Sequence, residues 1–127
     1  MIDVSNLIGV RFVNHGRSVA QGFDCYGLAI EVSKRNGHSL PDLWYVKSTD
    51  EVFSNNAERI IKSLSNVIEV TDLEEEGNLV VFFDGERMVH IGCIIEEDMF
   101  IHCDKFGVRI QKLSEYHRKN WRLYKWL

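Results

Sequence analysis

One cysteine and two histidines of this sequence have surroundings typical of a reactive site. Cys25 lies in the stretch Gly-Phe-Asp-Cys-Tyr-Gly-Leu at 22–28, at the start of an expected helix, and His90 and His102 follow in apolar segments far downstream. A free thiol with a pKa of about 8.5 is mostly protonated at neutral pH, and its thiolate is the nucleophile. A helix N-terminus and a neighbouring imidazole both stabilise the thiolate. These residues therefore predict attack by sulfur on a carbonyl carbon.

The chemistry gives each of the three side chains a role. We expect Cys25 to attack the carbonyl carbon, and His90 to take the thiol proton and return it to the leaving amine. His102 would hold the second ring nitrogen of His90 and fix its tautomer, as the third member of a triad does. The oxyanion would lie at the helix N-terminus, near the backbone N–H of Cys25. The other histidines are expected in polar, exposed loops: His15, His38 and His117.

The helix that carries the cysteine is expected to begin at Asp24 and to stop at Gly37. Asp24 can cap it, Gly37 suits the position just past its end, and residues 25, 28, 29 and 32 form an apolar face. Gly27 is costly inside a helix, by about 1 kcal/mol relative to Ala. Its presence indicates that another backbone approaches closely there.

The rest of the pattern predicts more helix and then strands. The first 65 residues have a helical pattern, with a second helix expected over 48–64 after a Ser48-x-x-Glu51 capping box. The apolar period then changes, and turn residues divide the second half. Helices followed by an antiparallel meander predict an α+β fold. The expected strands are 67–70, 79–83, 88–95, 99–103, 108–110 and 121–126.

The relative position of the two histidines depends on the turn at 96–98. With a three-residue loop there, Gly92 lies opposite His102, and His90 is a diagonal neighbour of His102 on the same face. Gly92 would leave room for the imidazole across from it. A two-residue loop would separate the histidines unless a bulge restored the register. We predict the three-residue loop.

Other interpretations of the same residues stay open. A free cysteine is often a small buried hydrophobe, and a histidine on an apolar strand is often a core or surface residue. A zinc site that adds Cys103 to the three residues fits by residue type. Adjacent strand residues point to opposite faces, however, so His102 and Cys103 cannot bind one ion. We expect no metal and no cofactor, and we expect Cys93 and Cys103 to face away from the triad as packing residues.

Composition limits the class of protein and its partners. The chain of 127 residues is expected to be one domain over 1–127, with 45% hydrophobic and 27% charged residues. A net charge of −4 argues against general nucleic-acid binding, and no apolar run is long enough for a membrane span. Three cysteines make no closed disulfide framework, so reduced thiols are expected.

The charges are distributed unevenly. Residues 69–86 carry seven acidic side chains and no Lys or Arg, whereas 105–127 carry seven basic ones and Glu115 as the single acid. We interpret the basic segment as a solvated edge. A docking surface for an anionic polymer or a partner protein is the open alternative.

Taken together, these motifs resemble the NlpC-type cell-wall cysteine peptidases, a papain-like family. The resemblance covers most of the chain, from Gly9 to about Ile110. The segment 14–18, Asn-His-Gly-Arg-Ser, looks like the branch found in tailed phages and phage-derived elements, where the domain belongs to tail-assembly or tail-tip peptidases. Residues 22–28 resemble the nucleophile motif, and residues 79–83 and 90–95 resemble the strands of the catalytic histidine. Residues 101–103 and 107–108 resemble the third catalytic position and the turn that follows it.

The resemblance implies a fold, a reaction and a setting. N-terminal helices would pack on a C-terminal antiparallel β-sheet in a single papain-like domain. The reaction would be hydrolysis of peptidoglycan stem peptides, at the bond between D-glutamate and a diamino acid, with Asp24 and Tyr26 lining the substrate cleft. The protein would be made in the bacterial cytoplasm, because no signal peptide is visible, and would reach a virion tail or the cell wall with phage tail proteins as partners.

Three positions depart from the family pattern. Tyr26 stands where serine is common, Phe12 stands upstream where an aromatic hydroxyl is frequent, and residues 76–78 read Glu-Gly-Asn instead of Pro-Gly-Asp. These departures concern substrate choice more than the triad. The alternatives are a non-catalytic tail-assembly or docking module, and a thiol-dependent amidase or acyl transferase on the same fold.

Overall fold

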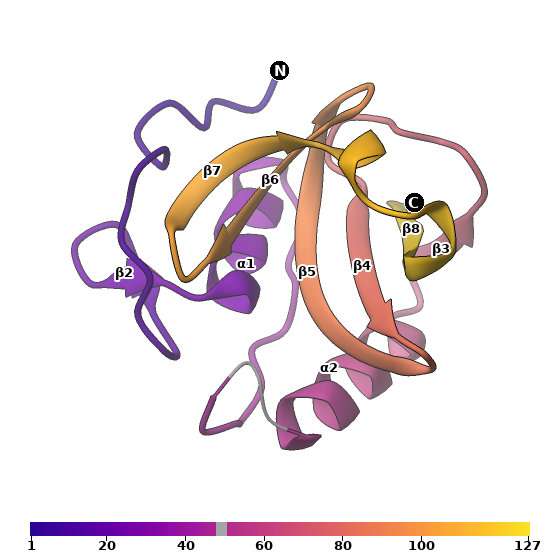
Figure 1. The fold of residues 1–127 in the computed structure, drawn as a ribbon, viewed down its shortest axis with the longest axis horizontal. Helices are drawn as coiled ribbons and strands as arrows, with labels where there is room; N and C mark the ends of the chain where they lie inside the picture. Colours follow the sequence, from indigo (N-terminus) through magenta and orange to yellow (C-terminus); the bar gives the residue numbers. More distant parts are fainter. Residues whose placement is uncertain (48–50) are drawn as a thin grey trace.

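Two helices and a six-stranded antiparallel sheet form the main body of residues 1–47 and 51–127, which this computed structural model describes. The strands follow the order β3-β8-β4-β5-β6-β7, so β4 to β7 form a meander and β8 returns between β3 and β4 (Figure 1). The expected α+β class is confirmed. The sheet strands are β3 (Val67–Val70), β4 (Leu79–Asp84), β5 (Arg87–Glu96), β6 (Met99–Asp104), β7 (Gly107–Lys112) and β8 (Trp121–Trp126), with 3-10 helices η1 (Leu113–Glu115) and η2 (Arg118–Asn120) before β8.

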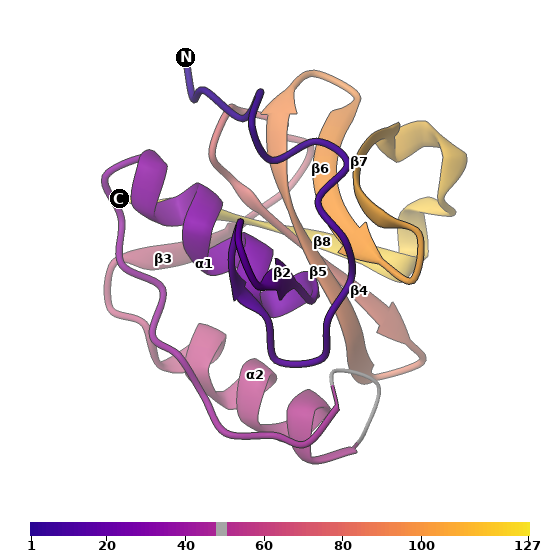
Figure 2. The same cartoon turned by 90° about the vertical axis from the view of Figure 1, so that its left-hand side faces the viewer.

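Helix α1 (Cys25–Arg35) begins and ends where its sequence predicts. The Asp24 carboxylate accepts a hydrogen bond from the Gly27 N–H at 2.8 Å and caps the first turn. The chain leaves the helix through Gly37, whose φ of +81° is a left-handed conformation that glycine adopts without strain. The helix packs across β5 and β6, which brings its first turn to the sheet (Figures 1 and 2).

A short hairpin, absent from the sequence expectations, packs against the start of α1. Strands β1 (Arg17–Ser18) and β2 (Gly22–Phe23) pair antiparallel. A Cβ added at Gly27 would lie 1.9 Å from the carbonyl oxygen of Gly16, so the expected close backbone approach is confirmed. The helical expectation for the chain before α1 is wrong, because positive φ values such as 60° at His15 make turns there.

Helix α2 (Glu51–Ser63) confirms the second expected helix over most of its length. It buries Phe53, Ala57 and Ile61 and packs against β5. Ser48, the first residue of the expected capping box, lies outside the described residues.

The sheet carries an apolar cluster on each face, as alternation along the strands requires. The larger cluster joins α1 and α2 to strand residues such as Ile91 and Ile101. The smaller cluster, on the other face, includes Phe82, Ile94 and Phe100. A side chain of β5 or β6 therefore faces either the helices or this second cluster.

The turn between β5 and β6 has a different length from the one predicted, but the position of Gly92 opposite His102 is the predicted one. The two strands leave only residues 97–98 in the turn, and a bulge occurs at Ile95. The three-residue loop is therefore wrong, but the bulge supplies the extra residue and restores the expected pairing. A Cβ added at Gly92 would lie 3.2 Å from the Cβ of His102, so the glycine does leave room for that residue.

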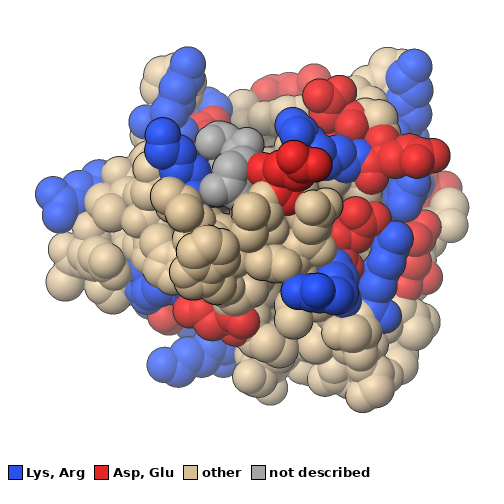
Figure 3. Space-filling model, turned by 90° about the horizontal axis from the view of Figure 1, so that it is seen from below, with Lys and Arg blue, Asp and Glu red and all other residues tan. Residues whose placement is uncertain are grey.

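The acidic and basic segments of the sequence meet in space. Lys125 Nζ lies 3.1 Å from a carboxylate oxygen of Glu75, and Arg118 Nε lies 3.4 Å from one of Asp72. Figure 3 shows Lys and Arg intermingled with Asp and Glu on the face seen from below. This pairing favours the interpretation of the basic segment as a solvated edge. Within the described residues, no helix has the length and apolar character needed to cross a bilayer.

Candidate active site

His90 on β5 and His102 on β6 lie side by side, as diagonal neighbours should. Nε2 of His90 is 2.8 Å from Nδ1 of His102, and the two ring planes are inclined at 83°. Burial, with a smaller contribution from the neighbouring His102, lowers the pKa of His90 to about 3. His90 is therefore a neutral imidazole at neutral pH.

Gln111 on β7 continues this row of polar groups. Its Oε1 lies 2.6 Å from Nε2 of His102 and accepts a hydrogen bond from the Tyr116 hydroxyl at 2.9 Å. Its Nε2 donates to the Glu115 carboxylate at 3.1 Å. Gln111 could not be recognised from the sequence, because its position beside His102 depends on the register between β6 and β7. Alternation along β7 would have indicated it once that register was known.

Cys25, the first residue of α1, lines a cavity of about 430 Å³ that His90 also lines. The Cys25 side chain is only 3% exposed. Cys25 and His90 therefore line one cavity, although Cys25 is almost fully buried. Around them lie Phe12, Asn14, Lys47, Val89, Cys103, Asp104 and Lys105.

The thiol and the histidine pair belong to opposite faces of the sheet. Cys25 is part of the cluster under α1. The histidines instead contact the second cluster: the ring centroid of His90 lies 5.5 Å from that of Phe82, and the ring centroid of His102 lies 4.6 Å from that of Phe100. A bulge at Val89, which also lines the cavity, interrupts the pairing of β5 with β4 just before His90. Bulges change the direction of neighbouring side chains, which accounts for His90 reaching the same cavity.

The surroundings of Cys25 favour the protonated thiol. Burial raises the pKa of the thiol to about 12, and the Asp24 carboxylate adds to the increase. Backbone hydrogen bonds from Ile91 and Tyr26 oppose it with smaller effects. Desolvation therefore outweighs the stabilisation of the thiolate that the helix N-terminus was expected to give. The site holds a neutral thiol and a neutral imidazole.

Asp24 fixes the start of α1 and does not face the cavity. Besides the Gly27 N–H, it accepts hydrogen bonds from Arg17 Nη1 at 2.9 Å and from the backbone N–H of His15 at 2.8 Å, and it also accepts one from the Tyr45 hydroxyl. Its exposed fraction is 0%, and its contacts are with the protein itself, so the expected contact between Asp24 and substrate stays a prediction. The sequence could not show that four donors converge on this carboxylate.

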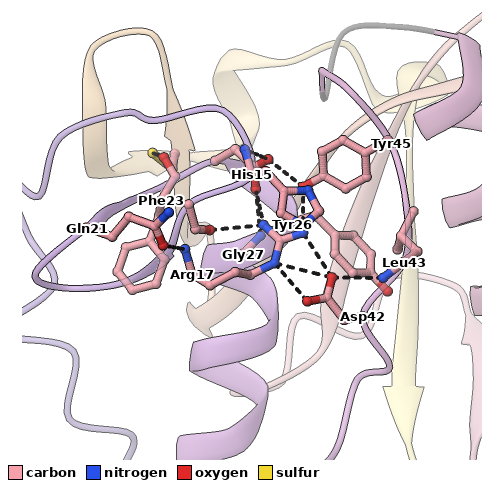
Figure 4. Close-up of polar contacts among 12 residues, drawn as sticks. His15, Arg17, Gln21, Phe23, Tyr26, Gly27, Asp42, Leu43 and Tyr45 are labelled. Atoms are coloured by element: carbon pink, nitrogen blue, oxygen red, sulfur yellow. Dashed lines mark hydrogen bonds and ion pairs between the residues drawn. The ribbon is translucent and has the colours of Figure 1, made fainter.

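Tyr26 is likewise buried and anchors the segment that follows α1. Its hydroxyl donates to the carbonyl oxygen of Pro41 at 2.6 Å, and its exposed fraction is 0%. Figure 4 shows Arg17 beside it, reaching to Asp42 at 2.9 Å and to the Tyr45 hydroxyl at 2.8 Å. Residues 41–45 thus lie over the beginning of the helix, and the expected contact between Tyr26 and substrate stays a prediction.

Cys103 lines the same cavity as Cys25, contrary to expectation. Strand alternation does place Cys103 on the face opposite His102, but α1 and Cys25 lie on that opposite face. The Cys103 thiol donates to the carbonyl oxygen of Phe23 at 3.1 Å. Cys93 is buried in the core, as expected.

The remaining histidines differ in their surroundings. His117 is exposed, as expected. His15 and His38 are half-buried, so the expectation of exposure is wrong for them: His15 packs on Tyr45, and His38 stacks on Trp126 with ring centroids 4.6 Å apart. Among the described residues, no group of three or more His, Cys, Asp or Glu side chains is placed to hold a metal ion.

Comparison with known proteins identifies the family. The model of the NlpC/P60 family matches residues 9–125, while no curated protein matches the sequence. The fold is similar to that of the NlpC/p60 domain of the peptidoglycan hydrolase SagA, with a TM-score of 0.64 and 18% identity over 95% of this chain and 90% of that chain. It is also similar to an NLP/P60 family protein, described as similar to lipoprotein, from Staphylococcus aureus subsp. aureus Mu50. That match has a TM-score of 0.57 and 23% identity over 90% of this chain and 36% of that chain.

The structural matches, at these identities, concern the fold, and they confirm the expected papain-like arrangement of helices on a sheet. The family match covers nearly the whole chain and includes Cys25, His90 and His102. The chain belongs to the NlpC/P60 family.

Proposed function

We propose that this protein is a cysteine peptidase that cleaves stem peptides of bacterial peptidoglycan. The observation that carries the proposal is the cavity that Cys25 and His90 share, together with the 2.8 Å contact between His90 and His102. A nucleophile, a base and a group that orients the base are the parts that acyl transfer requires. The similarity of the fold to a domain of a peptidoglycan hydrolase supports the choice of substrate class.

The neutral pair suggests how the reaction begins. The sulfur of Cys25 attacks the scissile carbonyl carbon while its proton passes to His90, so that neither charge has to exist in the resting site. The oxyanion lies at the N-terminus of α1, near the backbone N–H of Cys25. His90 then gives the proton to the leaving amine, and a thioester remains on Cys25. Water then attacks this thioester and gives a proton to His90, which passes it to the departing sulfur, so that the acyl group leaves as a carboxylic acid and the Cys25 thiol is restored.

The proposed scissile bond joins the side-chain carboxyl of D-glutamate to a diamino acid. Lys105, a cation that lines the cavity, suits a peptide that carries free carboxylates. We place the protein in a phage or prophage tail, with tail proteins as partners and the cell wall as its target, on the strength of the segment 14–18.

Incubation with defined muropeptides, followed by mass analysis of the products, tests the proposal. The expected products are two fragments whose summed mass exceeds that of the substrate by one water, with a new free amine on the diamino acid. Cys25→Ala should give no products, whereas Cys93→Ala, which removes a buried thiol outside the cavity, should leave them unchanged. Intact muropeptide after incubation with folded wild-type protein would favour the docking module. Products of a different mass would identify an amidase or an acyl transferase.

A further inference from the structure

The contacts of Gln111 determine where the protons of the two histidines lie. A carboxylate can only accept hydrogen bonds, so the group of Gln111 that lies 3.1 Å from Glu115 is its NH₂. The amide oxygen of Gln111 therefore faces Nε2 of His102, at 2.6 Å. Because an amide oxygen also only accepts, Nε2 of His102 must carry a hydrogen.

The same reasoning extends to His90. A neutral imidazole has one N–H and one lone pair, and burial lowers the pKa of both rings, which keeps them neutral. Since Nε2 of His102 donates, its Nδ1 accepts, and the donor is Nε2 of His90 at 2.8 Å. Nδ1 of His90 is then the ring nitrogen with a free lone pair. It is the atom that can take the proton of Cys25.

We propose that Gln111 is a positioning residue, oriented by Glu115, that sets the tautomers of His102 and His90 and leaves Nδ1 of His90 as the proton acceptor. The Tyr116 hydroxyl donates to the same amide oxygen at 2.9 Å, but a hydroxyl can also accept, so the carboxylate of Glu115 decides the orientation. A triad with aspartate places a carboxylate directly beside the histidine. Here the carboxylate of Glu115 lies at the far end of a chain of three hydrogen bonds.

The register between β6 and β7 places Gln111 beside His102. Phe100 pairs with Gln111, so Gln111 is a diagonal neighbour of His102 on the same face of the sheet. Glu115 ends the 3-10 helix η1, four residues after Gln111, where the backbone turns back over the end of β7. Three neighbouring strands thus each supply one member of the chain, and η1 supplies the carboxylate.

The tautomers can be measured directly on the resting protein by ¹⁵N NMR of histidine-labelled samples. We expect the Nε2–H form for both His90 and His102. An Nδ1–H form at His102 would overturn the proposal. The consequence for turnover rests on the proposed peptidase function, but this measurement needs no substrate and can be repeated in Cys25→Ala. Failure of the peptidase proposal therefore leaves the tautomer result intact, and the reverse also holds.

Two substitutions at Gln111 separate positioning from a merely structural role. Gln111→Leu removes the acceptor, so His102 should populate both tautomers, and kcat should fall by about tenfold or more with KM changed less than about twofold, because the wrong tautomer cannot take the thiol proton. Gln111→Glu keeps an acceptor and should restore the Nε2–H form and most of kcat. An unchanged tautomer in Gln111→Leu, or equal loss of kcat in both variants, would contradict the proposal.

If Gln111→Leu does not fold, Glu115→Gln provides the test instead. Glu115 is exposed, so this substitution should leave the fold intact. An amide at position 115 can donate or accept, so it no longer dictates the orientation of Gln111. We expect both tautomers of His102 in this variant. Lys112→Gln, an exposed change on the same strand, is the matched control and should leave the NMR spectrum of the histidines unchanged. A single Nε2–H form in Glu115→Gln would show that Glu115 does not orient the amide and would refute its role.

Discussion

The two reacting groups of the site are neutral at rest, and burial is the main reason for both. It raises the pKa of the Cys25 thiol to about 12 and lowers the pKa of His90 to about 3. At any pH between these two pKa values, neither Cys25 nor His90 carries a charge. In the proposed reaction, attack therefore begins from the uncharged pair, and the proton moves as the carbon–sulfur bond forms.

Labelling of Cys25 with iodoacetamide should be slow at about pH 6 and should accelerate steadily as the pH rises, because a raised thiol pKa lowers the thiolate fraction at every pH below it. Mass spectrometry of the peptide that contains Cys25 measures the rate. A free thiol with an ordinary pKa, such as that of N-acetylcysteine, is the reference and should react faster. Labelling at pH 6 faster than this reference would contradict the neutral thiol.

The pKa of His90 also predicts a dependence of stability on pH. The pKa is lowered in the folded state from its ordinary 6.5, so between 6.5 and about 3 the unfolded chain binds the additional proton. The free energy of unfolding should therefore decrease as the pH falls through this range, by at most about 1.4 kcal/mol per pH unit. Urea denaturation of wild type and His90→Gln measures it. An identical slope in both proteins would show that His90 does not titrate in this way.

Among the elements, α1 depends most on a buried charge at its start. The Asp24 carboxylate caps the helix and receives Arg17, while the backbone of Gly16 lies against Gly27. The helix N-terminus, and with it Cys25, is therefore fixed by the hairpin and by residues 36–47. These contacts give Asp24 a structural role at the start of α1, directly before Cys25.

Asp24→Asn should destabilise the protein by about 1–3 kcal/mol, because Arg17 Nη1 would lose its buried charged partner while Arg17 keeps its pairing with Asp42. Asparagine can still cap the helix, so the substitution isolates the charge. Asp42→Asn is the matched control: it removes the other, half-exposed partner of Arg17 and should cost less than about 1 kcal/mol. Denaturant unfolding measures both. Equal losses in the two variants would disprove the special role of Asp24.

The elements show what the sequence can predict. Local patterns were sufficient for α1 and for the strands of the six-stranded sheet, because caps and apolar periods depend on neighbouring residues, but they did not indicate the hairpin of β1 and β2. They were insufficient for the bulge at Ile95, since a bulge shows only in the pairing with another strand. The roles of Gln111 and Cys103 were missed for the same reason: one depends on the register of β7, and the other on which face of the sheet α1 covers.

In the whole molecule, the site lies where the two halves of the chain meet. The first half supplies Cys25 on α1, and the sheet of the second half supplies His90, His102 and Gln111 (Figures 1 and 2). The order of these groups along the chain could be recognised from the sequence, and the family match over residues 9–125 agrees with it. The protonation states could not be recognised, because they follow from the burial that tertiary packing produces.

The central claim is that Cys25 and His90 act as one nucleophile–base pair, and turnover of a defined muropeptide by matched variants tests it most directly. Cys25→Ala and His90→Ala should each abolish cleavage while circular dichroism shows an intact fold. His102→Ala should lower kcat less than His90→Ala does, and His117→Ala, at an exposed histidine away from the cavity, should cleave like the wild type. Cleavage near the wild-type rate by folded Cys25→Ala or His90→Ala would contradict the account.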